Sequence, residues 1–356
     1  MAPGPKAVPE LGDLAAMFAE MQQAPAIVQP SDFWTSLNAR NLSQLDDEGF
    51  AHFKRTINQN YFGWVPSSRH DDQVAVMLRE WLRRPAPRIL TSRLGDMSLL
   101  EAGPDRVNPY ESPRARVLLA LFLAMYWEYV RRRDPRGLLA RLEEPTLGDP
   151  VIARYRGRRI SQDICNSVHE LYSATHALPG GAPGPGGVLE LGAGYGRVGW
   201  VFLEAFPQTR YIVCDIPPAL GIAQQYLTTL FPDRPAFRFR HFDDGAEVAD
   251  ELASAQLAFL TPNQLELLDP LGVSLFVNIS SLHEMRPEQI AYYLGQVDRH
   301  TRGCFYTKQW RDWHNEEDDV RVGQHDYPIP EHWETVYSHQ HPVQRAFFHA
   351  LYRVGG

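Results

Sequence analysis

The sequence is poor in cysteine, in positive charge and in long apolar runs, and each shortage excludes a class of protein. Its three cysteines, Cys165, Cys214 and Cys304, are far apart and show no CxxC spacing, which argues against a disulfide framework and a thiolate zinc site. Lys and Arg number 35 against 43 Asp and Glu, and the resulting net charge of −8 would repel a nucleic-acid backbone. The longest apolar run, 117–127, is well short of the roughly 20 residues that cross a bilayer. We therefore expect a protein of the reducing cytoplasm, with no nucleic-acid or membrane partner.

The chain is long enough for two domains or for one domain with a large extension. It has 356 residues, of which 44% are hydrophobic and 22% charged, as in ordinary globular proteins. Residues 1–30 place a short amphipathic piece between proline-rich ends and predict a flexible N-terminal arm. Residues 31–158 carry apolar side chains mostly at spacings of three, four and seven, which predicts an all-helical N-terminal cap region. Residues 159–356 are predicted to form the second domain.

The second domain shows the alternation of strands and helices that is typical of a parallel sheet. It follows the run PGGAPGPGG at 179–187, which predicts a hinge or surface loop. The predicted strands are 188–191, 211–215, 257–260, 273–279 and 304–307, and the predicted helices are 197–206, 217–231 and 287–301. The runs 334–339 and 345–352 predict a closing antiparallel hairpin, whereas the place of the strand-like run 237–242 in the sheet stays open. The fold class is therefore α/β, with a Rossmann-like, mostly parallel sheet that ends in an antiparallel hairpin.

A glycine-rich turn follows the first of these strands directly and leads into a helix. Its glycines, Gly192, Gly194 and Gly196, would let the backbone approach a ligand closely. Asp215 lies 19 residues beyond Gly196, at the end of the next strand, where a carboxylate can accept hydrogen bonds from the two hydroxyls of an adenosine ribose. The combination predicts a site for an adenosine-containing cofactor.

Three interpretations of this turn are open. Gly194, Gly196 and Gly199 also satisfy the GxGxxG spacing of NAD(P)-dependent oxidoreductases, and a turn that only allows tight packing would belong to a catalytically silent scaffold. The third interpretation is a site for a ligand that carries an ammonium or sulfonium group. Glu190 favours it, because a carboxylate beside the turn suits such a group better than a pyrophosphate. S-adenosylmethionine is such a ligand.

The chain also resembles a known family. The run Glu190-Leu-Gly192-Ala-Gly194-Tyr-Gly196 resembles the first motif of class I S-adenosylmethionine-dependent methyltransferases. The runs at 33–34, 49–62, 214–217, 259–262 and 278–285 are similar to the sugar O-methyltransferases of bacteria. This resemblance covers most of the chain from Ser31 onward and implies methyl transfer to a hydroxyl of a sugar or glycosylated metabolite. The expected cofactor contacts are Gln162, Glu190, Gly192, Ala193, Gly194, Tyr195, Gly196, Asp215, Ile216, Pro217, Thr261, Asn278 and Ser280.

The catalytic residues are expected just beyond the strand at 273–279, because ligands in open α/β sheets bind outside the carboxyl ends of the strands. A sugar hydroxyl is a weak nucleophile until a base takes its proton. His283 is the predicted general base, since its ordinary pKa of about 6.5 leaves it neutral near pH 7. Glu284 would orient the imidazole, bind a sugar hydroxyl or balance the sulfonium charge. A packed histidine and a charge at a helix start are the structural alternatives, and Asp243 and His241 are rival bases.

The acceptor is expected between the helical region and the Rossmann-like domain, where pockets usually form. The expected contacts are Tyr61, Ser281, Lys308 and Trp310. Lys54, Arg55 and Asn58 would either line this pocket or form a solvated helical face, and the latter is favoured. Ser161 is interpreted equally as a helix N-cap or as a polar group near the cofactor. The acidic run 316–319 predicts a solvated loop, and no metal is expected. The sequence leaves open whether identical chains form an oligomer.

Overall fold

The computed structural model describes residues 13–61, 72–95 and 112–355, which fall into two compact units. The first unit comprises the residues up to Ala39, Leu171–His341 and the residues from Ala346 on. The second comprises Arg40–Glu170 and Pro342–Arg345. The first boundary differs from the predicted 30/31 because the segment before Arg40 belongs with the unit that holds the large sheet, and the second differs from the predicted 158/159 because the other unit continues to Glu170.

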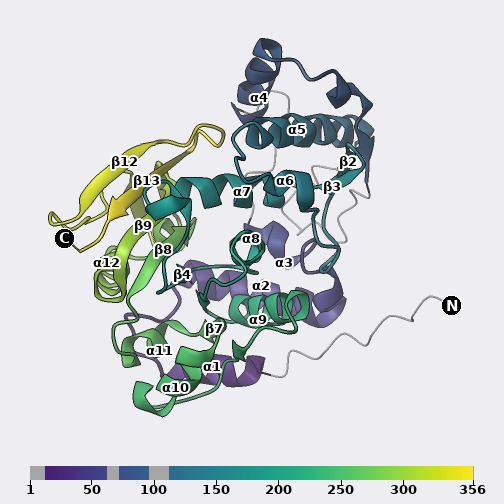
Figure 1. Ribbon diagram of the computed structural model, residues 1–356. Helices are drawn as coiled ribbons and strands as arrows, with labels where there is room; N and C mark the ends of the chain where they lie inside the picture. Colours follow the sequence, from purple (N-terminus) through teal and green to yellow (C-terminus); the bar gives the residue numbers. More distant parts are fainter. Residues whose placement is uncertain (1–12, 62–71, 96–111, 356) are drawn as a thin grey trace. The chain divides into compact units, whose positions relative to one another are not determined.

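An eight-stranded sheet forms the centre of the first unit and confirms the α/β class (Figure 1). All neighbouring strands are parallel except at one end, where β13 pairs antiparallel with both β9 and β12. The predicted closing hairpin is therefore present. In spatial order the strands are β12 (Glu334–Gln340), β13 (Phe347–Arg353), β9 (Thr301–Trp310), β8 (Val273–Ile279), β4 (Val188–Leu191), β5 (Tyr211–Cys214), β7 (Leu257–Leu260) and β6 (Ala236–Phe237).

The third strand of the parallel series is now assigned. β7 pairs with β5 over its whole length, whereas β6 has only two residues and pairs at the outer edge of β7. The run 237–242 is therefore mostly not a strand. Thr261, at the end of β7, accordingly lies at the same edge of the sheet as Asp215.

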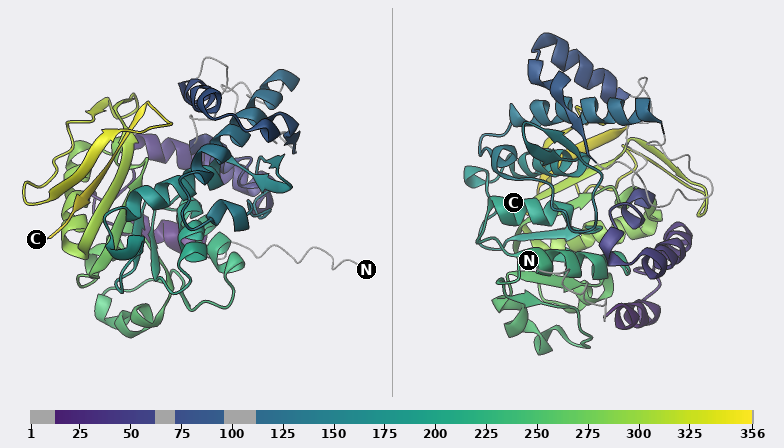
Figure 2. Two further views of the ribbon diagram at one scale, coloured as in Figure 1. Left: turned by 45° about the horizontal axis from the view of Figure 1, so that its top comes forward. Right: turned by 90° about the vertical axis from the view of Figure 1, so that its right-hand side faces the viewer.

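Helices cover both faces of this sheet (Figure 2). Tyr211 and Ile212 are neighbours on β5, so their side chains point to opposite faces. The Tyr211 ring lies 5.8 Å from Phe202 of α8 (Arg197–Ala205), whereas Ile212 belongs to the core that includes Leu294 of α12 (Pro287–His300). The remaining helices of the sheet are α9 (Ala219–Leu230), α10 (Ala249–Ser254) and α11 (Pro262–Leu267). Strands buried on both faces must be apolar throughout, which explains the continuous apolar runs in the sequence.

The segment before the sheet is a packed part of the first unit. Residues 13–30 include α1 (Leu14–Gln23), whose Met17 and Met21 are 0% and 4% exposed. Leu14 and Met17 lie against Gly221 of α9. The prediction of a flexible arm is therefore wrong for residues 13–30, because an apolar face of α1 is buried, and residues 1–12 lie outside the described part of the chain.

The second unit is mainly helical. Its helices are the later part of α2 (Asp32–Glu48), α3 (Ile57–Tyr61), α4 (Asp72–Arg83), α5 (Pro113–Arg131), α6 (Leu138–Arg141) and the first part of α7 (Gln162–Thr175). The apolar run at 117–127 lies in α5, in which every residue from Leu119 to Val130 except Leu121 is buried. Within the described ranges, no helix is long and apolar enough to cross a membrane. A small antiparallel sheet of β1 (Arg93–Leu94), β2 (Ala153–Tyr155) and β3 (Arg158–Ile160) corrects the expectation that this region is all-helical.

Two buried cations that follow α2 form ion pairs. Lys54 Nζ lies 2.5 Å from Glu144 Oε1, and Arg55 Nε lies 2.8 Å from Asp149 Oδ2. Both cations are at most 2% exposed, so the favoured interpretation as a solvated helical face is wrong. Ser161 is the N-cap of α7, since its hydroxyl accepts a hydrogen bond from the backbone N–H of Ile164 at 3.0 Å.

Candidate active site

The glycine-rich turn lies between β4 and α8, at the carboxyl edge of the sheet. Gly192 packs tightly, since a Cβ there would come within 2.3 Å of Ser281 Oγ. Gly194 has a φ of +59°, which side-chain-bearing residues rarely adopt, and a Cβ there would meet no atom within 4 Å. At Gly192 the turn packs against the loop after β8, whereas at Gly194 the space beside the backbone is empty.

Asp215 follows β5 and faces the same turn. Its Oδ2 accepts a hydrogen bond from Gly194 N–H, and its Oδ1 accepts one from Ile216 N–H, both at 2.7 Å. The residue is only 8% exposed, and this burial raises the pKa of its carboxyl group to about 7, although the two backbone donors lower it. Each carboxylate oxygen can accept a further hydrogen bond, so the group suits a ligand with two neighbouring hydroxyls.

A buried amide network joins β4, β8 and β9 beside this turn. Asn278 Nδ2 donates to the carbonyl of Leu191 at 2.9 Å and to Ser281 Oγ at 2.7 Å. Gln309 Nε2 donates to Asn278 Oδ1 at 2.6 Å. Asn278 and Gln309 are both 0% exposed, so their hydrogen bonds are made without competition from water.

His283 lies at the end of this network. It is 1% exposed, and its Nδ1 lies 2.9 Å from Gln309 Oε1. Its Nε2 has no hydrogen-bond partner in the described part of the chain and lies 3.6 Å from Glu284 Oε1. Burial lowers the pKa of His283 to about 4, and the bond to Gln309 offsets only part of this effect. The imidazole is therefore neutral at pH 7.

Glu284 neighbours His283 but does not contact its Nδ1. Its side chain is 13% exposed, and burial raises the pKa of its carboxyl group well above the ordinary range. Its Oε2 has no hydrogen-bond partner among the described residues. Of the three predicted roles, orientation of the imidazole at Nδ1 is performed by Gln309 instead.

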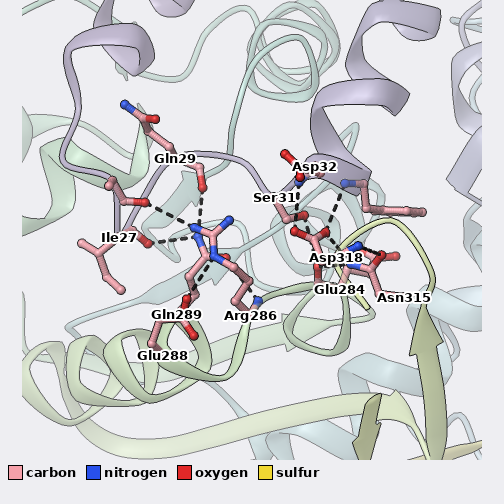
Figure 3. A network of polar contacts seen from close by, with 12 residues as sticks. Ile27, Gln29, Ser31, Asp32, Glu284, Arg286, Glu288, Gln289, Asn315 and Asp318 are labelled. Carbon is pink, nitrogen blue, oxygen red and sulfur yellow. Dashed lines mark hydrogen bonds and ion pairs between the residues drawn. The ribbon is translucent and has the colours of Figure 1, made fainter. Parts of the chain in front are cut away.

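The N-terminal segment is fastened directly beside Glu284 (Figure 3). Ser31 Oγ donates to the Glu284 carbonyl at 3.3 Å, and Gln289 Nε2 donates to the carbonyls of Ile27 at 3.0 Å and Gln29 at 2.9 Å. Asp318, from the acidic run, accepts hydrogen bonds at 3.2 Å from the first backbone N–H groups of α2, those of Asp32 and Phe33. The segment thus helps to hold the loop that carries His283 and Glu284.

Partly exposed aromatic rings lie next to His283. The Trp313 ring is 5.1 Å from the imidazole, 5.5 Å from Trp310 and 6.5 Å from Phe33 of α2. We call Phe33, Trp310 and Trp313 the aromatic group. All three belong to the first unit and are partly exposed, and Trp313 joins them to the imidazole.

Several predicted residues make contacts that do not involve His283. Glu190 is buried and accepts a hydrogen bond from the Tyr211 hydroxyl at 2.6 Å. Lys308 neighbours Gln309 on β9, so it points to the opposite face, where its ammonium lies 5.2 Å from the centre of the Phe347 ring. The rival bases differ sharply in exposure from His283, since the side chains of His241 and Asp243 are 59% and 89% exposed.

The remaining predicted contacts are placed as follows. Tyr195 packs its ring 5.2 Å from Tyr226, Thr261 donates its N–H to Gln264 Oε1 at 3.2 Å, and Ser280 donates its N–H to the Lys308 carbonyl at 2.7 Å. Ala193, Gly196 and Pro217 lie in the turn and in the loop after β5. Gln162 lies in the second unit, where it donates to Gln73 Oε1 at 3.2 Å, and the side chain of Tyr61 is outside the described residues.

Sequence reasoning missed Gln309 and the contacts of residues 13–33. The sequence does carry a signal for Gln309, because alternation along β9 places it on the face opposite Lys308, the predicted acceptor contact. The partners of the N-terminal segment had none, since Ser31 and Glu284 are separated by 253 positions in the chain.

Comparison with known proteins identifies similar solved structures only. Neither protein-family models nor curated sequences match the chain. The PH0226 protein of Pyrococcus horikoshii OT3 is 12% identical with a TM-score of 0.39, over 55% of this chain and 92% of that one. The 1,6-didemethyltoxoflavin-N1-methyltransferase of Burkholderia thailandensis is 17% identical with a TM-score of 0.37, over 53% and 79%. Mitomycin 7-O-methyltransferase is 13% identical with a TM-score of 0.36, over 65% and 60%. With TM-scores this low, the case for a function rests on the residues of the site.

Proposed function

We propose that the protein is an S-adenosylmethionine-dependent O-methyltransferase that acts on a hydroxyl of a sugar or glycosylated metabolite. The observation that carries the proposal is the buried, neutral imidazole of His283, with Nε2 unpartnered within the described ranges, in the loop that follows the strand beside the glycine-rich turn. A base for an alcohol needs such a lone pair near the reacting atoms.

The residues present fit the cofactor. The space above Gly194, which a Cβ would enter without contact, allows the backbone to approach an adenosine ligand, and Asp215 would accept hydrogen bonds from its ribose hydroxyls. When bound, S-adenosylmethionine supplies a methyl group on a positively charged sulfur that is open to in-line displacement. Two of the similar proteins are methyltransferases by name, one acting at oxygen and one at nitrogen.

His283 would accept the proton of the acceptor hydroxyl, and the aromatic group would bind the acceptor. The acceptor hydroxyl would give its proton to His283 Nε2 as its oxygen forms a bond to the methyl carbon and the carbon–sulfur bond breaks. The partly exposed rings of the aromatic group would pack against the apolar face of a sugar, and Glu284 would bind a second hydroxyl. Positioning alone contributes to the rate, because the methyl donor is already activated.

The sheet favours this proposal over a dinucleotide-dependent oxidoreductase. The dinucleotide-binding Rossmann sheet is built from parallel strands in the order 3-2-1-4-5-6. Here the end beyond β9 carries an antiparallel strand inserted between β9 and β12, as expected for the methyltransferase domain that the sequence resembles.

Gly194→Ala is expected to weaken binding of S-adenosylhomocysteine by about 10- to 100-fold, because an added methyl would occupy the space assigned to the cofactor. The matched control is Gly180→Ala, whose φ of +63° and empty surroundings impose a similar backbone cost in the loop before β4. Calorimetric titration of both variants measures the difference. Equal affinities in the two variants would contradict the placement of the cofactor.

Cofactor affinity is expected to rise with pH through about 7. Ribose hydroxyls donate best to an ionised carboxylate, and the pKa of Asp215 is raised to about 7 in the free protein, so binding below that pH must release a proton. Affinity should fall by up to about tenfold per pH unit below 7. Asp215→Asn should bind more weakly and lose the pH dependence. If the slope persists in this variant, another group carries it.

Incubation with methyl-labelled S-adenosylmethionine and a panel of sugars, glycosides and amines tests the proposed reaction. The proposal predicts label in a methyl ether of a sugar hydroxyl. Label found only on nitrogen would show that the acceptor is an amine and not a hydroxyl. The absence of transfer to any hydroxyl in the presence of bound cofactor would refute the proposal.

A further inference from the structure

The main chain fixes the orientation of the Asn278 amide. The Leu191 carbonyl can only accept a hydrogen bond, so the Asn278 atom 2.9 Å from it must be the amide nitrogen. The backbone N–H of Leu282 can only donate, and it lies 3.3 Å from the other atom, Oδ1. Both ends of the amide are therefore assigned by groups whose hydrogen-bonding roles are known.

The assignment passes from Asn278 to Gln309. The Gln309 atom 2.6 Å from Asn278 Oδ1 must donate and is the amide nitrogen. The other atom, Oε1, must accept, and the backbone N–H of His283 donates to it at 3.3 Å. The backbone N–H of His283 thus fixes the orientation of the Gln309 amide independently of its contact with Asn278.

The tautomer of His283 follows. Its Nδ1 lies 2.9 Å from Gln309 Oε1, an acceptor, so Nδ1 must carry the hydrogen. In the neutral ring the lone pair is then on Nε2, the atom without a hydrogen-bond partner among the described residues. A chain of hydrogen bonds therefore links the strand before the glycine-rich turn to the lone pair that the reaction needs.

We propose that Gln309 is a positioning residue that fixes Nε2 of His283 as the proton acceptor. This inference rests on the proposed function for its catalytic consequence. A neutral amide at this position sets the tautomer without placing a negative charge beside the imidazole. Burial keeps the histidine neutral, and burial also raises the pKa of the Glu284 carboxyl, which lies 3.6 Å from Nε2 on the other side of the ring, so the base needs no ionised partner.

The first test measures the tautomer without any reaction. In protein labelled with ¹⁵N-histidine, two-bond ¹H–¹⁵N correlations distinguish a protonated Nδ1 from a protonated Nε2, and His283→Gln identifies the signals of His283. The inference predicts protonated Nδ1 in the wild type. In Gln309→Leu, signals of the Nε2-protonated ring should appear. Protonated Nε2 in the wild type would overturn the inference even if methyl transfer is observed.

The second test measures turnover and its pH dependence. Gln309→Leu should lower turnover by about 10- to 100-fold with an unchanged KM for S-adenosylmethionine, since a misplaced base costs on the order of 10² in rate. Gln309→Glu places a carboxylate at Nδ1, so it should raise the pKa of His283 and move the acidic limb of the rate profile to higher pH. This shift would not arise from a purely structural role.

Thr307→Val is the matched control. Thr307 Oγ1 accepts a second hydrogen bond from Gln309 Nε2 at 2.9 Å, so its loss disturbs the same network while both assigned amide contacts remain. This variant should keep both the tautomer and the turnover. An unchanged tautomer and rate in Gln309→Leu would overturn the inference. Protonated Nδ1 that depends on Gln309, in a protein that transfers no methyl group, would support the positioning and refute the proposed function.

Discussion

Replacing His283 by alanine is expected to lower turnover by about 10²–10⁴-fold while leaving affinity for S-adenosylmethionine nearly unchanged. The loss is expected because the variant removes the proton acceptor, whereas Asp215 and the glycine-rich turn keep their contacts with each other. Quenched time-course assays of methyl transfer measure turnover, and calorimetric titration measures cofactor affinity.

His300→Ala is the matched control for this variant. His300 is 0% exposed, and burial lowers its pKa to about 4, as for His283, but it lies at the carboxyl end of α12 and accepts a hydrogen bond from Leu271 N–H. Its replacement should lower stability without a comparable loss of turnover. Equal losses in the two variants would show that the effect of His283→Ala is on folding.

The pH profile gives a further check on His283. The base acts in its neutral form, and its pKa is lowered to about 4, so turnover at saturating cofactor should be level from about pH 5 to 7 and fall only below this range. An acidic limb near the ordinary histidine value of about 6.5 would contradict the burial of this group.

A chain that begins at residue 31 is expected to lose about 3–6 kcal/mol of unfolding free energy, since burial of each of the two methionines of α1 contributes about 1.5–3 kcal/mol. Met17 and Met21 are 0% and 4% exposed, and Gln289 would also lose both of its carbonyl partners, those of Ile27 and Gln29. Denaturant titration followed by fluorescence measures the change.

The control for this truncation is a chain that begins at residue 13, which keeps every contact described for α1. It should unfold close to the full-length chain. If both truncations left the unfolding midpoint unchanged, the burial of Met17 and Met21 would contribute nothing to stability, and the prediction of a dispensable arm from the sequence would be restored.

The sequence predicted the parallel strands well because their residues are apolar on both faces. The strands 257–260 and 273–279 have the predicted ends, and the closing hairpin pairs as expected. The sheet order could not be read from the sequence, since the pairing of β5 with β7 joins residues more than 40 positions apart. The run 237–242 looked like a strand but mostly leaves the sheet after Phe237.

The arm was mispredicted although its signal was visible. Leu14, Met17 and Met21 have the spacing of a buried helical face, but the prolines around them suggested a loose segment. The decisive partners are distant in sequence, such as Gly221 of α9 and the loop at Glu284. Tertiary contacts of this kind decide whether a short amphipathic helix packs or frays.

The placement of the candidate site residues, as distinct from their roles, was predicted in part. Asp215 and the glycine-rich turn are in contact, and His283 lies just beyond β8, because strand ends at one edge of a parallel sheet converge. Gln309 was missed because the choice of Lys308 and Trp310 rested on residue type and took no account of alternation along the strand.

Calorimetric titration with S-adenosylhomocysteine and, separately, with NADH decides whether the glycine-rich turn and Asp215 bind the methyltransferase cofactor. S-adenosylhomocysteine is expected to bind at one site per chain, Asp215→Ala to weaken this binding by about 1–3 kcal/mol, and NADH not to bind. Binding of NADH without binding of S-adenosylhomocysteine would contradict the proposed function, and so would an affinity for S-adenosylhomocysteine that is unchanged in Asp215→Ala.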